Sequence, residues 1–185
     1  MSLLRAELLE GRRVAVAGDL GGELGGALSG LGAETEALDL TELPSGEEAV
    51  GQWARSHGPF HALVYLSGAS FGAGGDAALS ATLEEAWAAV REIAVGALID
   101  ADHPGKLVLV GPAADAGPLA RAAGAGLENL ARTLSVEWAR HRVTSVMVSP
   151  GPGSTAASLS TLVGFLVSEA GDYLSGCRVE LGTGR

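Results

Sequence analysis

A hydrolase-like pattern is the first chemical feature of the sequence. Residues 68–72 read Gly-Ala-Ser-Phe-Gly, which matches the motif around a serine nucleophile, and Asp115 and His141 follow in the order of a hydrolase triad. In such an enzyme a helix begins directly after the serine and supplies an oxyanion amide. The next residues, 73–76, read Ala-Gly-Gly-Asp, which predicts a loop. We therefore expect Ser70 to be a loop residue and not a nucleophile.

The other reactive side chains do not indicate a metal site or a disulfide. The sequence has four histidines, His57, His61, His103 and His141. They are too scattered to suggest a metal site. Cys177 is the only cysteine, so no disulfide can form within the chain. We expect His61 and His103 to be solvated turn residues. We expect Asp19 to be a turn residue whose side chain bonds to a nearby amide.

The composition indicates a compact folded protein with an acidic surface. Hydrophobic residues make up 47% of the 185 residues, charged residues only 18%, and the net charge is −10. This charge repels nucleic-acid phosphates and anionic membranes, so we expect neither as a partner. Residues 1–10 lack the apolar core of a signal peptide, and no apolar run is long enough to span a membrane. We expect the protein in the cytoplasm.

The elements that must position any site alternate along the chain between short apolar runs and longer helical patterns. This alternation is typical of βαβ units with a buried parallel sheet. The predicted strands are residues 14–17, 35–38, 62–66, 107–110, 143–148 and 178–181. We predict an α/β fold, a doubly wound parallel sheet of about six strands with helices on both faces, in one domain over residues 1–185.

Two hydroxyl–carboxylate pairs, Ser45 with Glu48 and Thr82 with Glu85, predict helix starts by reciprocal capping. Pro118 suits the first turn of another helix, because it has no amide to satisfy there.

The two longest predicted helices span residues 83–101 and 118–140 and have apolar residues at helical spacing. Stretches 68–75 and 149–154 are predicted loops. Three tryptophans lie on apolar helical faces, where we expect core or interface packing: Trp53, Trp87 and Trp138.

The order of these motifs resembles the short-chain dehydrogenase/reductase family over nearly the whole chain. Residues 16–22 are similar to its glycine-rich turn, and residues 63–68 lie where it carries an Asn-Asn-Ala-Gly segment. Trp87, the helix at 126–137 and the Pro-Gly loop at 148–151 match further family features. The resemblance implies a Rossmann-like fold, NAD(P) as cofactor and oxidoreductase activity.

The resemblance also places the four catalytic positions on residues that cannot transfer protons. The family's tyrosine and lysine positions fall on Ala120 and Gly124, its serine position on Pro112 and its asparagine position on Ala94. Lys106 is the only lysine, and no tyrosine stands four residues before it. We therefore predict that the protein catalyses no hydride transfer.

The resemblance implies cofactor-binding roles for Gly18, Gly22, Gly25, Asp39 and Thr155. The glycines are spaced G-x-x-x-G-x-x-G, whereas the family has G-x-x-x-G-x-G. Asp39 stands where a ribose-binding acid should, yet residues 39–41 also resemble the later segment that lines the adenine pocket. We infer that a strand and a helix between these two segments are lost, and that the substrate lid after residue 151 is shortened. We expect no cofactor, or weak NAD(P) binding.

These departures favour a non-catalytic subunit of a homo-oligomer or of a complex with a catalytically complete short-chain dehydrogenase. The alternative is an NAD(P)-dependent oxidoreductase or nucleotide-sensing protein of the same family. In the family, the helices that correspond to residues 83–101 and 118–140 pair across a two-fold axis. We therefore expect a dimer or tetramer built on helix 118–140, with Leu127 and Leu134 in the interface.

Overall fold

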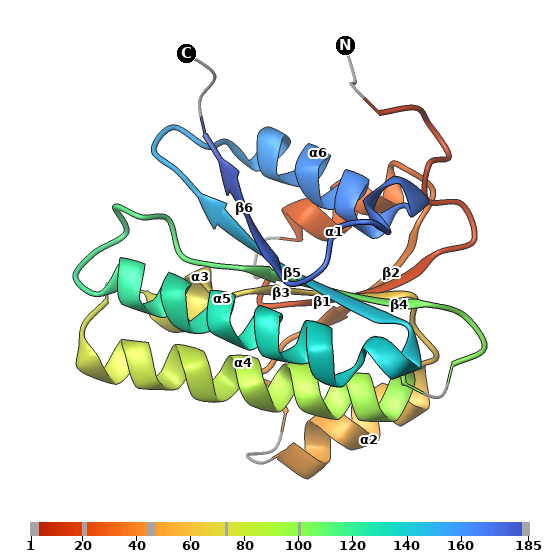
Figure 1. The fold of residues 1–185 in the computed structure, drawn as a ribbon, viewed down its shortest axis with the longest axis horizontal. Helices are drawn as coiled ribbons and strands as arrows, with labels where there is room; N and C mark the ends of the chain where they lie inside the picture. Colours follow the sequence, from red (N-terminus) through yellow and green to blue (C-terminus); the bar gives the residue numbers. More distant parts are fainter. Residues whose placement is uncertain (1–3, 20–21, 44–46, 73, 100, 183–185) are drawn as a thin grey trace.

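Six parallel strands form the centre of the molecule (Figure 1). The computed structural model describes residues 4–19, 22–43, 47–72, 74–99 and 101–182. The strands are β1 (Arg13–Ala17), β2 (Glu34–Leu38), β3 (Ala62–Leu66), β4 (Gly105–Val110), β5 (Val143–Pro150) and β6 (Cys177–Leu181). They lie in the order β2-β1-β3-β4-β5-β6, so the predicted doubly wound sheet is confirmed, with each strand within two residues of its predicted bounds.

Helices cover both faces of this sheet (Figure 1). They are α1 (Glu23–Ser29), α2 (Glu47–His57), α3 (Gly68–Phe71), α4 (Asp76–Ala97), α5 (Ala120–Glu137) and α6 (Ala156–Val167), with short 3-10 helices η1 (Ala139–His141) and η2 (Glu169–Gly171). Helices α1 and α6 lie on one face, and α2, α4 and α5 on the other. Two apolar cores result, and every residue of β4 is buried between them, as expected for a parallel strand. Among the described residues, no helix combines the length and apolar character that a membrane crossing requires.

The sheet is trimmed on the side of β2. In the usual doubly wound order, 3-2-1-4-5-6, two strands lie beyond the first strand. Here β2 alone lies beyond β1, and the chain then passes to α2 and β3. The structure thus has the shortened edge that the sequence predicts. The connection from β5 to α6 is also short, because Pro150 ends the strand and Ala156 begins the helix.

Two predicted helix starts are wrong. Helix α4 begins at Asp76, so Thr82 lies buried inside it, with no hydrogen-bond partner for its hydroxyl among the described residues. The alanine-rich segment before Thr82 favours a helix, and an acidic first residue suits the helix dipole, so the helix extends further back. Helix α5 begins at Ala120, not Pro118, because Leu119 between them has a left-handed φ of 68°. Ser45 lies outside the described residues.

The predicted loop at residues 68–75 is also partly wrong, because its first residues form the one-turn helix α3. Trp53 and Trp138 pack against the core as predicted, whereas Trp87 is 41% exposed. Leu127 and Leu134 are fully buried in the protein's own core. The apolar stripe of α5 is therefore used within the monomer, and these two leucines are not available to a partner.

Candidate functional site

Three of the four predicted catalytic positions meet at the carboxyl ends of β4 and β5. Pro112 lies two residues beyond β4, and Ala120 and Gly124 lie on successive turns of α5. Together with Ser149 and other residues they line a cavity of about 270 Å³. The carboxyl ends of the strands are where doubly wound folds bind their ligands. The fourth position, Ala94, lies on the buried side of α4 and does not line this cavity.

Tight packing leaves little room for larger side chains around this cavity. Ala120 is 2% exposed and packs against Phe71 and Ala123. A Cβ on Gly111 would lie 2.5 Å from the Cε of Met147, so the methionine fills the space behind the end of β4. Ala120 is thus part of a packed wall, whereas a Cβ on Gly124 would make only an ordinary contact, 3.6 Å from the same Cε.

The polar groups of the cavity are a serine and two arginines. Besides Ser149, the wall includes Arg121 and Arg178 and contains no Asp, Glu, His, Cys, Lys or Tyr. Arg178 forms ion pairs with Glu128, at 3.4 Å, and with Glu180. Hydroxyl and guanidinium groups do not titrate near neutral pH. The lining residues therefore provide no general acid or base.

Neither tyrosine substitutes for the missing phenol. The Tyr65 side chain is buried under α4, where its hydroxyl donates to the Oε1 of Glu85 at 2.9 Å and lies 3.2 Å from the Oγ of Ser70. Burial raises the pKa of Tyr65, with the Glu85 charge adding to the effect. Tyr173 is 95% exposed. Neither lines the cavity.

The glycine-rich turn keeps part of its expected conformation. Gly18 has a left-handed φ of 80°, and a Cβ there would lie 2.3 Å from the carbonyl oxygen of Leu66. This close approach between the ends of β1 and β3 explains the glycine without any ligand. Gly22 has a φ of 66° and precedes α1. The amide of Gly25 donates to the Oδ2 of Asp19 at 2.9 Å, which confirms Asp19 as a turn residue.

The described residues of this turn place negative charge at the start of α1, where the phosphates of a dinucleotide would bind. Such phosphates bind the free amides at the start of the helix after the first strand. In this protein the Asp19 carboxylate already accepts the Gly25 amide, and Glu23 adds a second carboxylate in the first turn of α1. Two negative charges at this position repel a third anion.

Asp39 and Thr155 are each held by their own turns. The Oδ1 of Asp39 accepts the amide of Thr41 at 2.8 Å and its hydroxyl at 2.6 Å, which lowers the pKa of Asp39. Thr155 caps α6: its hydroxyl accepts the amide of Ser158 at 3.1 Å, and the Ser158 hydroxyl accepts the amide of Thr155. Their local hydrogen bonds account for both residues without a cofactor.

The hydrolase pattern does not assemble in three dimensions. Ser70 lies in α3, and its hydroxyl donates to the carbonyl of Ser67 at 3.2 Å. Asp115 precedes α5 and His141 follows it, and the 18 residues of this helix span about 27 Å. His141 instead accepts a hydrogen bond from Arg140. A helix does follow the strand, contrary to the predicted loop, but the triad is absent.

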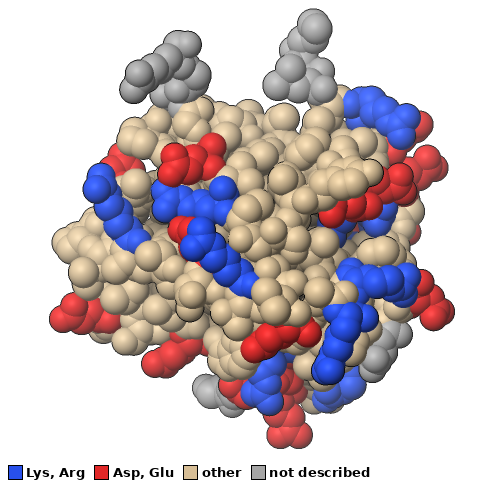
Figure 2. All heavy atoms as spheres, viewed as in Figure 1, with Lys and Arg blue, Asp and Glu red and all other residues tan. Residues whose placement is uncertain are grey.

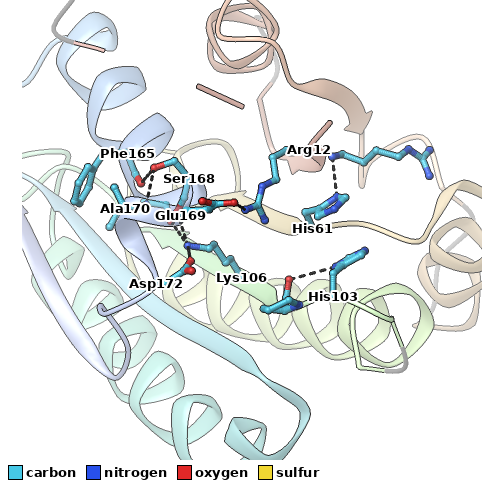
Figure 3. A network of polar contacts seen from close by, with 12 residues as sticks. Arg12, His61, His103, Lys106, Phe165, Ser168, Glu169, Ala170 and Asp172 are labelled. Atoms are coloured by element: carbon cyan, nitrogen blue, oxygen red, sulfur yellow. Dashed lines mark hydrogen bonds and ion pairs between the residues drawn. The ribbon is translucent and has the colours of Figure 1, made fainter. Parts of the chain in front are cut away.

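The opposite end of the sheet holds a polar network around Lys106 (Figure 3). Lys106 is buried in β4, and its Nζ donates to the carbonyls of Ser168 at 2.6 Å and Leu166 at 3.2 Å. The same atom lies 2.5 Å from the Oδ1 of Asp172. Burial lowers the pKa of Lys106, against the opposing effect of Asp172. A lone lysine inside an apolar strand was the sequence signal for this network, which joins β4 to the end of α6.

His61 and His103 lie in bends, as predicted, but both are half-buried and not solvated. Their rings stack with centroids 3.8 Å apart, and the Nδ1 of His61 accepts the backbone amide of Arg13 at 3.0 Å (Figure 3). Burial lowers the pKa of His61 to about 4, and the charges of His103, Arg12 and Arg13 act in the same direction. No group of His, Cys, Asp or Glu among the described residues has a metal-binding arrangement.

Comparison with known proteins identifies the fold. No protein-family model matches the sequence, and no curated protein matches it. Solved structures match over nearly the full length: a short chain dehydrogenase from Mycobacterium smegmatis has a TM-score of 0.78 at 20% identity, covering 100% of this chain and 97% of its own. A short-chain dehydrogenase/reductase variant from Serratia marcescens has 0.76 at 18% identity, with coverages of 94% and 96%. The citronellol catabolism dehydrogenase of Pseudomonas aeruginosa has 0.72 at 20%, with 97% of both chains covered. The chain therefore has the short-chain dehydrogenase/reductase fold.

Proposed function

We propose that this protein is a non-catalytic member of the short-chain dehydrogenase/reductase family that works through assembly. It acts as a homo-oligomer or beside a catalytically complete relative. The wall of the 270 Å³ cavity carries this proposal, because Pro112, Ala120 and Gly124 leave it without a group that exchanges protons near neutral pH. Carbonyl reduction and alcohol oxidation both require such a group.

The state of the cofactor turn supports the same conclusion. Asp19 occupies the Gly25 amide that a phosphate would need, and Asp39 and Thr155 are engaged by neighbouring residues. We expect no saturable binding of NADH or NADPH in isothermal titration, and no hydride transfer with panels of ketones and alcohols. A dissociation constant for NADH or NADPH of about 1 μM, or hydride transfer at a rate that scales with the amount of purified protein, contradicts the proposal.

The outward faces of α4 and α5 are the proposed assembly surface. Val95 on α4 is 57% exposed and Val136 on α5 is 78% exposed, each near the carboxyl end of its helix. A charge at these positions disturbs an interface without entering the core. We expect sedimentation velocity to give a dimer or tetramer for the wild type and a smaller species for Val95→Glu, Val136→Glu. A wild type that stays monomeric alone and with an intact relative contradicts assembly.

The second candidate is an NAD(P)-dependent oxidoreductase or a nucleotide-sensing protein. It is favoured by the left-handed Gly18 and Gly22, which keep the turn after β1 in a form that allows close backbone approach. Substituting Asp19→Ala frees the Gly25 amide. If the wild type binds dinucleotide and Asp19→Ala binds it more tightly, this turn is a working site and the sensing role is preferred.

A further inference from the structure

The net negative charge of the protein comes from one segment, residues 14–90. Residues 14–90 contain eleven Asp and Glu residues and one basic residue, Arg55. The rest of the chain contains eleven acidic and eleven basic residues. On the face in Figure 2, over which α5 and β6 run, positive and negative side chains are interspersed accordingly. The electrostatic field of the acidic segment attracts cations from solution.

A cavity of about 620 Å³ lies within this acidic segment, between the loop after β2, the start of α2 and the first half of α4. Its size suits a small organic ligand. It shares no residue with the cavity at the ends of β4 and β5. The lining residues are Leu40, Thr41, Leu43, Glu47, Val50, Glu84, Glu85, Trp87, Ala88 and Ala89.

The cavity combines an aromatic ring, an apolar floor and an excess of carboxylates. Trp87 is 41% exposed, and the floor is apolar because Leu40 and Leu43 pack against the core. The described lining contains no lysine or arginine and three glutamates: Glu47, Glu84 and Glu85.

Neighbouring residues compensate this charge only in part. Arg91 pairs with Glu47 at 2.7 Å, but it also lies 3.7 Å from Glu92, a further carboxylate. Glu85 accepts a hydrogen bond from the neutral Tyr65. Glu84 is exposed and has no ion-pair partner among the described residues. A cationic ligand in this cavity can therefore pair with the Glu84 carboxylate, which no arginine or lysine of the described residues neutralises.

We propose that this cavity binds a small organic cation, an alkylammonium or arylammonium with an apolar body. The indole face of Trp87 attracts such a cation through its negative quadrupole. Glu84 supplies the counter-charge, and the floor around Leu40 and Leu43 receives the apolar body. The proposal goes beyond the non-catalytic role and does not depend on it.

Isothermal titration with three probes of similar shape tests the proposal: benzyltrimethylammonium, neutral benzyl alcohol and anionic benzoate. We expect the cation to bind at least about tenfold more tightly than either other probe, and its affinity to fall as salt is raised from about 0.05 to about 0.5 M. Glu84→Gln and Trp87→Leu each weaken the cation by about three- to tenfold. Glu137→Gln, an exposed carboxylate at the end of α5, is the matched control and leaves binding unchanged.

Amide chemical shifts locate the bound probe, and circular dichroism confirms that each variant folds. Perturbations at the loop after β2 and at Glu84 to Trp87 support the site. The proposal is overturned if the cation does not bind, if benzyl alcohol binds as tightly, or if neither variant weakens the complex. Binding of an arginine-rich peptide without binding of the small cation also overturns it, because it indicates a protein-docking surface.

Discussion

The two ends of the sheet differ in where their chemically capable residues lie. At the carboxyl ends of the strands, where this fold binds ligands, the cavity wall consists of Pro112, Ala120, Gly124 and similar small residues. At the amino ends lie Lys106, which pairs with Asp172, and the stacked rings of His61 and His103 (Figure 3). The protein's only lysine is thus a structural residue.

This difference shows that residue type alone does not locate function in a doubly wound fold. The protein itself satisfies Lys106, which binds two carbonyls and Asp172, and His61, which accepts the Arg13 amide, whereas the buried Nε2 of His103 has no partner among the described residues. A satisfied buried group contributes to stability and has no bond left for a substrate. We therefore expect removal of a polar group at the amino end to cost more stability than removal of a polar group at the carboxyl end.

The largest effect is expected for Lys106→Met. This change removes the ammonium while keeping the apolar stem, so Asp172 and the carbonyls of Leu166 and Ser168 lose a donor that is almost fully buried. Urea unfolding should show a loss of about 2–4 kcal/mol. Asp172→Asn should cost less, because that carboxylate is half exposed. If Lys106→Met lost no more unfolding free energy than the loss of an exposed ion pair costs, the expected difference in stability between the two ends of the sheet would be contradicted.

The second-largest loss of stability is expected when Ala120→Tyr and Gly124→Lys rebuild the family's tyrosine–lysine pair. Ala120 is 2% exposed against Phe71 and Ala123, so a tyrosine overpacks this wall. We expect a loss of about 1–3 kcal/mol and no hydride transfer. Ala122→Tyr, at an exposed position of α5, is the control and should leave stability nearly unchanged. Hydride transfer by the rebuilt protein would mean that the remaining site is intact.

A pH-dependent effect is expected at His61. Its pKa is about 4 in the folded protein, against about 6.5 in the unfolded chain. The unfolded chain therefore binds more protons between these values, and stability falls as the pH falls from about 6.5 to about 4. His61→Asn keeps an acceptor for the Arg13 amide but cannot be protonated. Unfolding at pH 7, 5.5 and 4.5 should show a shallower decline for this variant, and equal declines would contradict the shift.

The sequence predicted the sheet well because burial on both faces leaves a strong local signal. The central strands β1, β3, β4 and β5 are short, mostly buried apolar runs, and the bounds of β3 are those predicted. The edge strands β2 and β6 mix charged with apolar residues and carry a weaker signal. Helix starts were predicted less well. The pairing of Thr82 with Glu85 is a local pattern, whereas the start of α4 depends on the alanine-rich residues before it and on Gly75. In the folded protein Glu85 binds Tyr65 instead.

The candidate site was predictable only in outline. The three residues that the resemblance singled out, Pro112, Ala120 and Gly124, line one cavity. Asp19 bonds to an amide only six residues away, as predicted for a turn residue, whereas the stacking of His61 on His103 depends on how the elements pack. No periodicity or spacing in the sequence encodes such contacts between distant segments. The burial of Leu127 and Leu134 was missed for the same reason, because an apolar stripe does not reveal which neighbour it meets.

The smallest effect is expected for Arg178→Gln at the carboxyl end. The Arg178 side chain is 38% exposed, and it forms ion pairs with Glu128 and with Glu180, which is 71% exposed. Glu128 keeps a second partner, Arg132 at 2.6 Å, so the change strands no buried charge. We expect a loss below about 1 kcal/mol, which shrinks further in high salt because the pairs are solvated. Urea unfolding at low and high salt measures this. A salt-insensitive loss as large as that of Lys106→Met would show that the carboxyl end also depends on a buried ionic network.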